Sequence, residues 1–268
     1  MAYRMSHPAR WNPDRKVLGL TLMDQITQST DEARIRKLIA VATRTLNHQG
    51  ILGYSGHISA RLAGSGDEYV IQAFDQSRAE VTPDDLVVVD GDGNFVRGRD
   101  GARPPDEVAI HTEILRVRGD VNAVFHFHPH VATLFTMVKG VQLLPVDAHA
   151  FRWASGIPVH PVPAKINDAD MGAALAATLG DHNAALMRAH GAVLVAESIE
   201  ALMIDAIHFC ENAEANYKAA MLGTVTPLSE DDMTLIASKL NRAAHTGKLW
   251  DYYTGLAVAA GAVPPDWL

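Results

Sequence analysis

The chain has 268 residues, of which 48% are hydrophobic and 20% are charged, and its formal net charge is −8. The proportions are those of an ordinary globular protein, and the lack of a basic stripe argues against a nucleic-acid partner. The single cysteine excludes an internal disulfide, and no apolar run is long enough to span a membrane or serve as a signal peptide. We therefore expect a cytoplasmic enzyme that acts on a small molecule.

The N-terminal segment differs in character from the rest of the chain. Residues 1–28 mix proline, arginine and tryptophan without a clear period, which predicts an N-terminal arm. Ser29 and Glu32 have the spacing of a capping box, so the first helix is expected to begin there and to stop at Gly50. No repeat or linker follows, and residues 29–268 are predicted to form a single domain.

The remaining segments alternate between strand-like and helix-like patterns. In chain order, we expect strands at 56–61, 69–74, 86–89 and 94–96, a helix at 104–119, a strand at 122–129, a helix at 130–138, strands at 142–146 and 159–162, a helix at 168–180, a strand at 184–188, and helices at 198–222 and 229–245. This order predicts one domain of the αβα type.

The strand at 122–129 carries the most informative pair of residues. His126 and His128 occupy alternate positions, so their side chains project to the same side of the strand, whereas Phe125 and Phe127 point the other way into a core. Two neighbouring imidazoles at a strand end provide half of a metal site. The pair predicts that the protein binds a divalent metal.

Two further residues are candidate ligands, each with a structural alternative. His190 follows an apolar run at a His-Gly step, where Gly191 allows a sharp turn, so it is either a ligand or a turn residue. Glu107 opens the helix before the paired histidines and is either a ligand or an acid that stabilises the helix dipole. His111, one turn later, either supports the metal site or is exposed.

Four short motifs follow one another in a recognisable order. They read Gly53-Tyr54-Ser55-Gly56-His57-Ile58-Ser59-Ala60-Arg61, Pro104-Pro105-Asp106-Glu107, His126-Phe127-His128-Pro129 and His190-Gly191. Together they resemble the class II aldolase and adducin family, and the connecting text at 82–90 and 116–121 is also similar. The resemblance covers approximately residues 30–245.

This resemblance implies an α/β protein with a three-layer αβα fold around a central mixed, largely antiparallel sheet. It implies that His126, His128 and His190 hold a divalent metal and that Glu107 ligates the resting metal and serves as acid or base. Zinc, manganese, iron or cobalt suits such ligands, and no organic cofactor is expected. Retention of the ligands favours an enzyme over the adducin branch, and the family implies a homo-oligomer, a tetramer with sites between subunits.

The chain departs from the sugar-phosphate aldolases wherever those enzymes bind phosphate. His57 stands in place of an asparagine, the segment 72–78 contains no glycine, and Pro105 and Asp106 replace a pair of serines. Phosphate binding requires N–H groups, hydroxyls and positive charge, whereas proline lacks a donor and a carboxylate repels a dianion. A phosphorylated substrate is therefore not expected.

The Gly-His-x-Ser-x-Arg version instead resembles a metal-dependent branch that decarboxylates dihydroxyphthalates or hydroxypyridine dicarboxylates. We expect a carboxy-lyase that removes a ring carboxylate ortho to a hydroxyl, with the metal as Lewis acid and electron sink. In this hypothesis Arg61 or Arg78 binds a carboxylate, and Glu107 or His57 supplies the ring proton.

Two other residues are assigned to substrate binding, and two other function classes stay open. His130 lies two residues beyond the histidine pair, and Tyr252 would reach the site from a neighbouring subunit unless it serves in packing. The first alternative function is an aldolase, dehydratase or epimerase acting on a small non-phosphorylated hydroxy-carbonyl compound. The second is a non-catalytic adducin-like interaction module.

Overall fold

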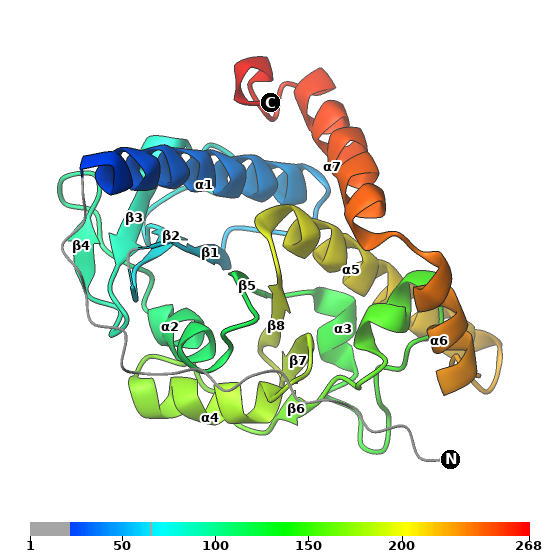
Figure 1. Cartoon of the computed structure of the whole chain (residues 1–268). Coiled ribbons are helices and arrows are strands. Elements are labelled where there is room, and N and C mark those ends of the chain that lie inside the picture. Colours follow the sequence, from blue (N-terminus) through cyan, green and yellow to red (C-terminus); the bar gives the residue numbers. More distant parts are fainter. Residues whose placement is uncertain (1–21, 65) are drawn as a thin grey trace, which may run out of the picture.

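A single eight-stranded sheet organises the protein. The computed structural model describes residues 22–64 and 66–268 (Figure 1). The strands are β1 His57–Arg61, β2 Tyr69–Gln72, β3 Leu86–Val89, β4 Phe95–Arg97, β5 Ala123–Phe127, β6 Val159–His160, β7 Ala184–Met187 and β8 Gly191–Ala196. Their order across the sheet is β4-β3-β2-β1-β5-β8-β7-β6, and only the β6–β7 pair is parallel. The predicted mixed, largely antiparallel sheet is confirmed.

Helices cover both faces of this sheet and give the predicted three layers. They are α1 Leu22–His48, α2 Val108–Val117, α3 His130–Leu134, α4 Ala169–Leu179, α5 Ile199–Leu222, α6 Glu230–Lys239 and α7 Arg242–Ala259, with 3-10 turns η1 Pro83–Asp85, η2 Ala148–Trp153 and η3 Pro265–Trp267. Helices α1 and α5 lie on one face, and α2 and α4 lie on the other (Figure 1). In the described part of the chain, no helix is both long enough and apolar enough to cross a membrane.

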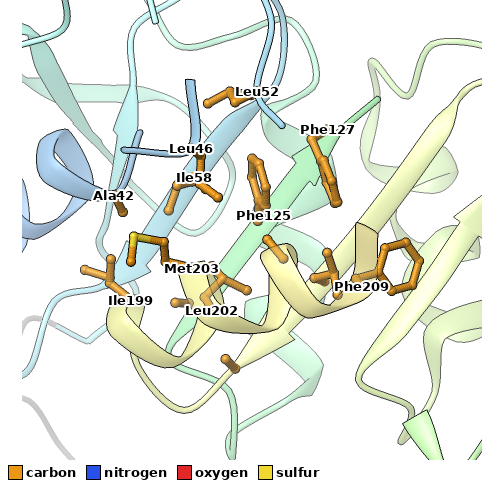
Figure 2. Close-up of a cluster of buried hydrophobic side chains, with 14 of the residues drawn as sticks. Ala42, Leu46, Leu52, Ile58, Phe125, Phe127, Ile199, Leu202, Met203 and Phe209 are labelled. Atoms are coloured by element: carbon orange, nitrogen blue, oxygen red, sulfur yellow. The ribbon is translucent and has the colours of Figure 1, made fainter. Parts of the chain in front are cut away.

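The alternation along β5 decides which side chains enter which core. Phe125 and Phe127 are fully buried, stack on each other with ring centroids 4.3 Å apart, and pack with α1 and α5 in the core drawn in Figure 2. Val124 joins the core under α2 and α4. His126 follows the same alternation and therefore faces the α2 side, as the sequence predicts.

Strand pairing brings the sequence motifs together around β5. His57 of β1 lies opposite His126 on one side of β5, and Ala192 of β8 lies opposite Phe127 on the other. Because register in a sheet is set by the buried pattern of both faces, these cross-strand neighbours are fixed together with the core.

Two of the predicted helices differ from the structure. Helix α1 begins at Leu22 and runs through the capping signal at Ser29, because such a local signal is only a weak preference. Residues 22–28 of the predicted arm therefore belong to α1, and residues 1–21 lie outside the described part. The predicted helix 229–245 is two helices, because the Asn241 side chain accepts a hydrogen bond from the Ala244 N–H and caps α7.

The predicted strand at 142–146 is not part of the sheet. Its backbone bonds to side chains of α5 instead: Asn212 and Asn216 donate to the Leu144 carbonyl, and the Val146 N–H donates to Asn212 Oδ1. Conversely, β8 was not predicted. The turn before Gly191 is so short that residues 185–195 read as one apolar run, which hides the two separate strands β7 and β8.

Candidate metal centre

Four predicted ligands converge at one end of β5. His126 is within β5, His128 directly follows it, His190 lies in the β7–β8 turn, and Glu107 is the N-cap of α2. One ligand atom from each lies within 4.8 Å of all the others. The two Glu107 oxygens are 3.4 Å from His126 Nε2 and 3.5 Å from His190 Nε2. The four candidate ligands thus come from three separate parts of the chain.

The bonding of His126 indicates what the cluster is built to hold. Its side chain is fully buried, and Nδ1 lies 3.1 Å from the Ala192 carbonyl oxygen, which can only accept. Nδ1 therefore carries a proton, so in the neutral ring the lone pair is on Nε2. That Nε2 is buried and has no hydrogen-bond partner. Once the ring is neutral, this nitrogen faces a carboxylate and two more imidazoles, an arrangement suited to a divalent cation.

The turn that delivers His190 is tightly constrained. Ala189 has a φ of 54°, a left-handed conformation that costs a non-glycine residue roughly 1–2 kcal/mol. At Gly191 an added Cβ would clash with the Phe127 carbonyl oxygen and would lie 2.8 Å from His128 Cδ2. Only glycine lets β8 start this close to the histidine pair, so the His-Gly motif serves both the ligand and its neighbour.

Charges within the cluster favour the forms that bind metal. Burial by itself would raise the pKa of Glu107, but the His126 and His190 imidazoles and the Ile166 N–H lower it to about 2, so this carboxyl is ionised. Burial, reinforced by the charges of neighbouring histidines, lowers the pKa of His128 to about 4 and also lowers that of His190. Both imidazoles are therefore neutral at pH 7, as a metal ligand must be.

A buried hydrogen-bond chain stands beside the cluster and supports His57. His57 Nδ1 lies 2.7 Å from His111 Nε2, and His111 Nδ1 lies 2.7 Å from Ser59 Oγ. Burial is the main cause that lowers the pKa of His57 well below its ordinary value and that of His111 to about 3. His111 is thus neither exposed nor a ligand but the group that orients His57. Its position four residues after Glu107 was the available signal.

A cavity opens next to Glu107 and His57. Its volume is about 220 Å³, below the roughly 300–1,000 Å³ of drug-sized sites, so it suits a small substrate. Arg78 lines it, donating Nε to the Gly56 carbonyl and Nη1 to the Gln76 carbonyl, which leaves Nη2 without a hydrogen bond to the described residues. Lys165, which carries no sequence signal, also lines the cavity and pairs with Asp106.

Three predicted site residues lie elsewhere. Arg61 is at the opposite end of β1 from His57, about 13 Å along the strand, where it donates to the Leu115 carbonyl and lies over the Tyr69 ring. Of the two arginines predicted to bind a substrate carboxylate and contribute to catalysis, Arg61 therefore does not line the cavity. His130 lines a different hollow with His128. Tyr252 is on α7, is 57% exposed and is absent from the described cavity lining, so its role stays a prediction.

Comparison with known proteins agrees with this architecture. The family profile of the class II aldolase and adducin N-terminal domain matches residues 36–217. The chain belongs to this family. Among its relatives, the 3,4-dihydroxyphthalate decarboxylase of Arthrobacter keyseri is 33% identical over 69% of this chain and 78% of that enzyme. The Rhodococcus jostii enzyme of the same name is 27% identical over 82% and 95%, respectively.

A solved structure extends the match over most of the fold. The aldolase II superfamily protein from Pseudomonas syringae superimposes with a TM-score of 0.75 at 23% identity, covering 87% of this chain and 95% of that one. Class II aldolases use a divalent metal, and the Glu107 cluster offers this chain a matching ligand set. The cluster is called the Glu107 centre below.

We expect the His126→Ala variant to bind one equivalent of divalent metal per chain less than the wild type. The substitution removes the ligand whose lone pair has no other partner. Elemental analysis of desalted protein measures the difference, with exposed His48→Ala as the matched control. His128, which directly follows β5, is more accessible than His126, so His128→Ala should show the same loss with less disturbance of the core; full retention of metal in both variants would refute the ligand assignment.

The buried His111 predicts a characteristic acid sensitivity. Unfolded histidine titrates near pH 6.5 and folded His111 at about 3, so below pH 6.5 the unfolded state binds the extra proton and stability falls. In His111→Gln, the pH slope of the unfolding free energy should decrease by about 1.4 kcal/mol per pH unit between approximately pH 5.5 and 4.5. Urea unfolding at several pH values measures it, and an unchanged slope would contradict a neutral buried His111.

Proposed function

We propose that this chain is a metal-dependent decarboxylase that removes a ring carboxylate ortho to a hydroxyl from a hydroxylated aromatic or pyridine dicarboxylate. The observation that carries the proposal is one cavity lined by a guanidinium, a buried imidazole and the ionised Glu107 beside three histidines. The two relatives that are 3,4-dihydroxyphthalate decarboxylases support the substrate class.

The cavity is poorly suited to a phosphorylated sugar. Pro105 lines it without an N–H group, and Asp106 contributes a carboxylate that is already paired with Lys165 and Arg103. A dianionic phosphate would face this carboxylate and would find few backbone donors. A planar substrate with separate carboxylates makes smaller demands on the same surface.

Arg78 is the residue proposed to bind the substrate carboxylate that is retained. Its Nε and Nη1 donate to backbone carbonyl oxygens, which hold the guanidinium in place. The Nη2 donors are therefore available to a substrate carboxylate without further ordering of the side chain. Burial lowers the pKa of Arg78 to about 10, which still leaves it charged at pH 7. Charge-assisted hydrogen bonds to carboxylates are among the stronger ones available in proteins.

Glu107 is the residue proposed to move the proton. A divalent metal bound by His126, His128, His190 and Glu107 would supply Lewis-acid stabilisation of negative charge on the ring oxygens. Ionised Glu107 accepts the proton of the ring hydroxyl and returns it to the ring carbon that carries the departing carboxylate. The bond to the carboxylate carbon then breaks, its electron pair restores the aromatic ring as a phenolate, and CO2 leaves. The phenolate takes a proton from water.

His57 has a different part in this proposal. Its lowered pKa leaves it neutral at pH 7, and its Nδ1 is committed to His111, so only Nε2 is available to the cavity. We assign it to hydrogen bonding with a substrate oxygen, because a neutral imidazole is a weaker acid than a protonated carboxyl group.

The proposal is tested by supplying Mn²⁺ or Zn²⁺ and screening ortho-hydroxy aromatic and pyridine dicarboxylates for CO2 release. We expect release from substrates that carry the hydroxyl and none from matched dicarboxylates that lack it, because the hydroxyl supplies both the proton and the electron sink. Aldehyde formation from small hydroxy-carbonyl compounds, with no CO2 from any dicarboxylate, would favour the aldolase alternative.

The Glu107→Gln variant tests the proton-transfer role. Turnover should fall by about 10²–10⁴-fold, which is the typical contribution of a general acid or base, while the three histidines retain the metal. Steady-state kinetics and elemental analysis on the same sample separate the two effects. Turnover within a fewfold of wild type, with metal bound, would show that another group moves the proton.

A further inference from the structure

A second group of histidines lies outside the Glu107 centre. His149 of η2, His208 of α5 and His245 of α7 each offer one ring nitrogen within 4.8 Å of the others. Their ring centroids are 4.0, 5.4 and 5.8 Å apart, a spacing similar to the 5.0, 5.1 and 5.2 Å among the three histidines of the Glu107 centre. We propose that this cluster, the His208 site, binds a second divalent transition metal.

An ion-pair layer beneath the cluster fixes the three elements that carry it. Three residues from each histidine, the same elements supply Arg152, Asp205 and Arg242, and the buried Asp205 accepts from both arginines at 2.8–3.0 Å. Residues three apart on a helix are neighbours on its surface, so the imidazoles form a second layer above the ion pairs. Elements locked in this way hold the backbones of the three ligands in place.

The imidazoles have few other partners. His208 is only 6% exposed, and Nε2 of His245 is buried without a hydrogen-bond partner. Such a nitrogen normally finds a donor, an acceptor or a metal. The Glu211 carboxylate, one turn after His208 on α5, interacts electrostatically with His149 and can serve as an additional ligand or counter-charge.

The ligand types define the ion. Three imidazoles, with or without a carboxylate, suit Zn²⁺, Cu²⁺, Ni²⁺ or Co²⁺ rather than Mg²⁺ or Ca²⁺, which prefer oxygen ligands. His149 stacks flat on His208, with 7° between the rings, and must turn for both to face one ion. Its contact with solvent permits that rotation and gives the ion a path of entry.

The placement of the site suggests a structural role. His245 lies beyond residues 36–217, which the family profile matches, so the ion would join α7 to η2 and α5 of the matched domain. No residue of the His208 site lines the cavity beside Glu107. Loss of this metal should therefore lower thermal stability and leave turnover within about twofold of wild type.

The experiment is zinc stoichiometry on the full-length protein. Each variant is stripped with chelator, saturated with Zn²⁺, desalted and measured by elemental analysis. Wild type and the exposed control His48→Ala should hold two equivalents per chain, His245→Ala and His126→Ala one each, and the double variant none. Because His149 is accessible, His149→Ala should reproduce the loss seen in His245→Ala without disturbing the core.

A second readout uses Co²⁺ in the His126→Ala background, where visible absorption of the bound ion should report the His208 site alone and disappear on adding His245→Ala. The proposal fails if wild type holds one equivalent and His245→Ala also holds one. If His245→Ala loses an equivalent while His126→Ala does not, the His208 site stands and the assignment of the Glu107 centre falls.

Discussion

The pairing of β5 with β1 on one side and β8 on the other is the constraint on which the rest of the structure depends. It places His57 opposite His126 and brings the Ala192 carbonyl to His126 Nδ1, a contact between residues 66 positions apart. This contact fixes the tautomer and thereby exposes a lone pair where the other ligands converge. A slip of one residue would exchange His126 with the phenylalanines that fill the opposite core.

The centre is assembled at the end of a central strand, where the neighbouring backbones must approach closely. Gly56 has a φ of 109°, and a Cβ there would lie 2.8 Å from the His126 carbonyl oxygen. Gly191 meets the same strand from the other side. The two glycines of separate motifs thus flank the end of β5, where the close backbones leave no space for a Cβ.

The two histidine clusters illustrate different ways to position ligands. The Glu107 centre relies on strand register and on a strained turn at Ala189. The His208 site relies on one 3-10 turn and two helices, held by the Arg152–Asp205–Arg242 ion pairs. A buried carboxylate shared by two guanidiniums is costly to leave unpaired, so this network resists separation of α7 from α5.

Local pattern was sufficient for much of the protein. The alternation at 125–128 correctly separated core phenylalanines from site histidines, because side-chain direction along a strand is a local property. The motif order identified the family, and with it the layered fold and the four residues that converge. The prediction of a strand at 142–146 was wrong, since side-chain amides of α5 make the backbone hydrogen bonds that a neighbouring strand would otherwise provide.

Only the tertiary structure decided between candidate site residues that the sequence pattern does not distinguish. Arg61 and Arg78 were both candidates to bind a carboxylate. Arg61 lies at the far end of β1 from the cavity, whereas Arg78 lies on a loop that lines it. His111 acquired its role from packing of α2 against β1, and Lys165 entered from a loop without a motif. The sequence by itself determined which ligands exist and which way a strand presents them. Their partners depend on register and helix packing between distant segments, which no local period encodes.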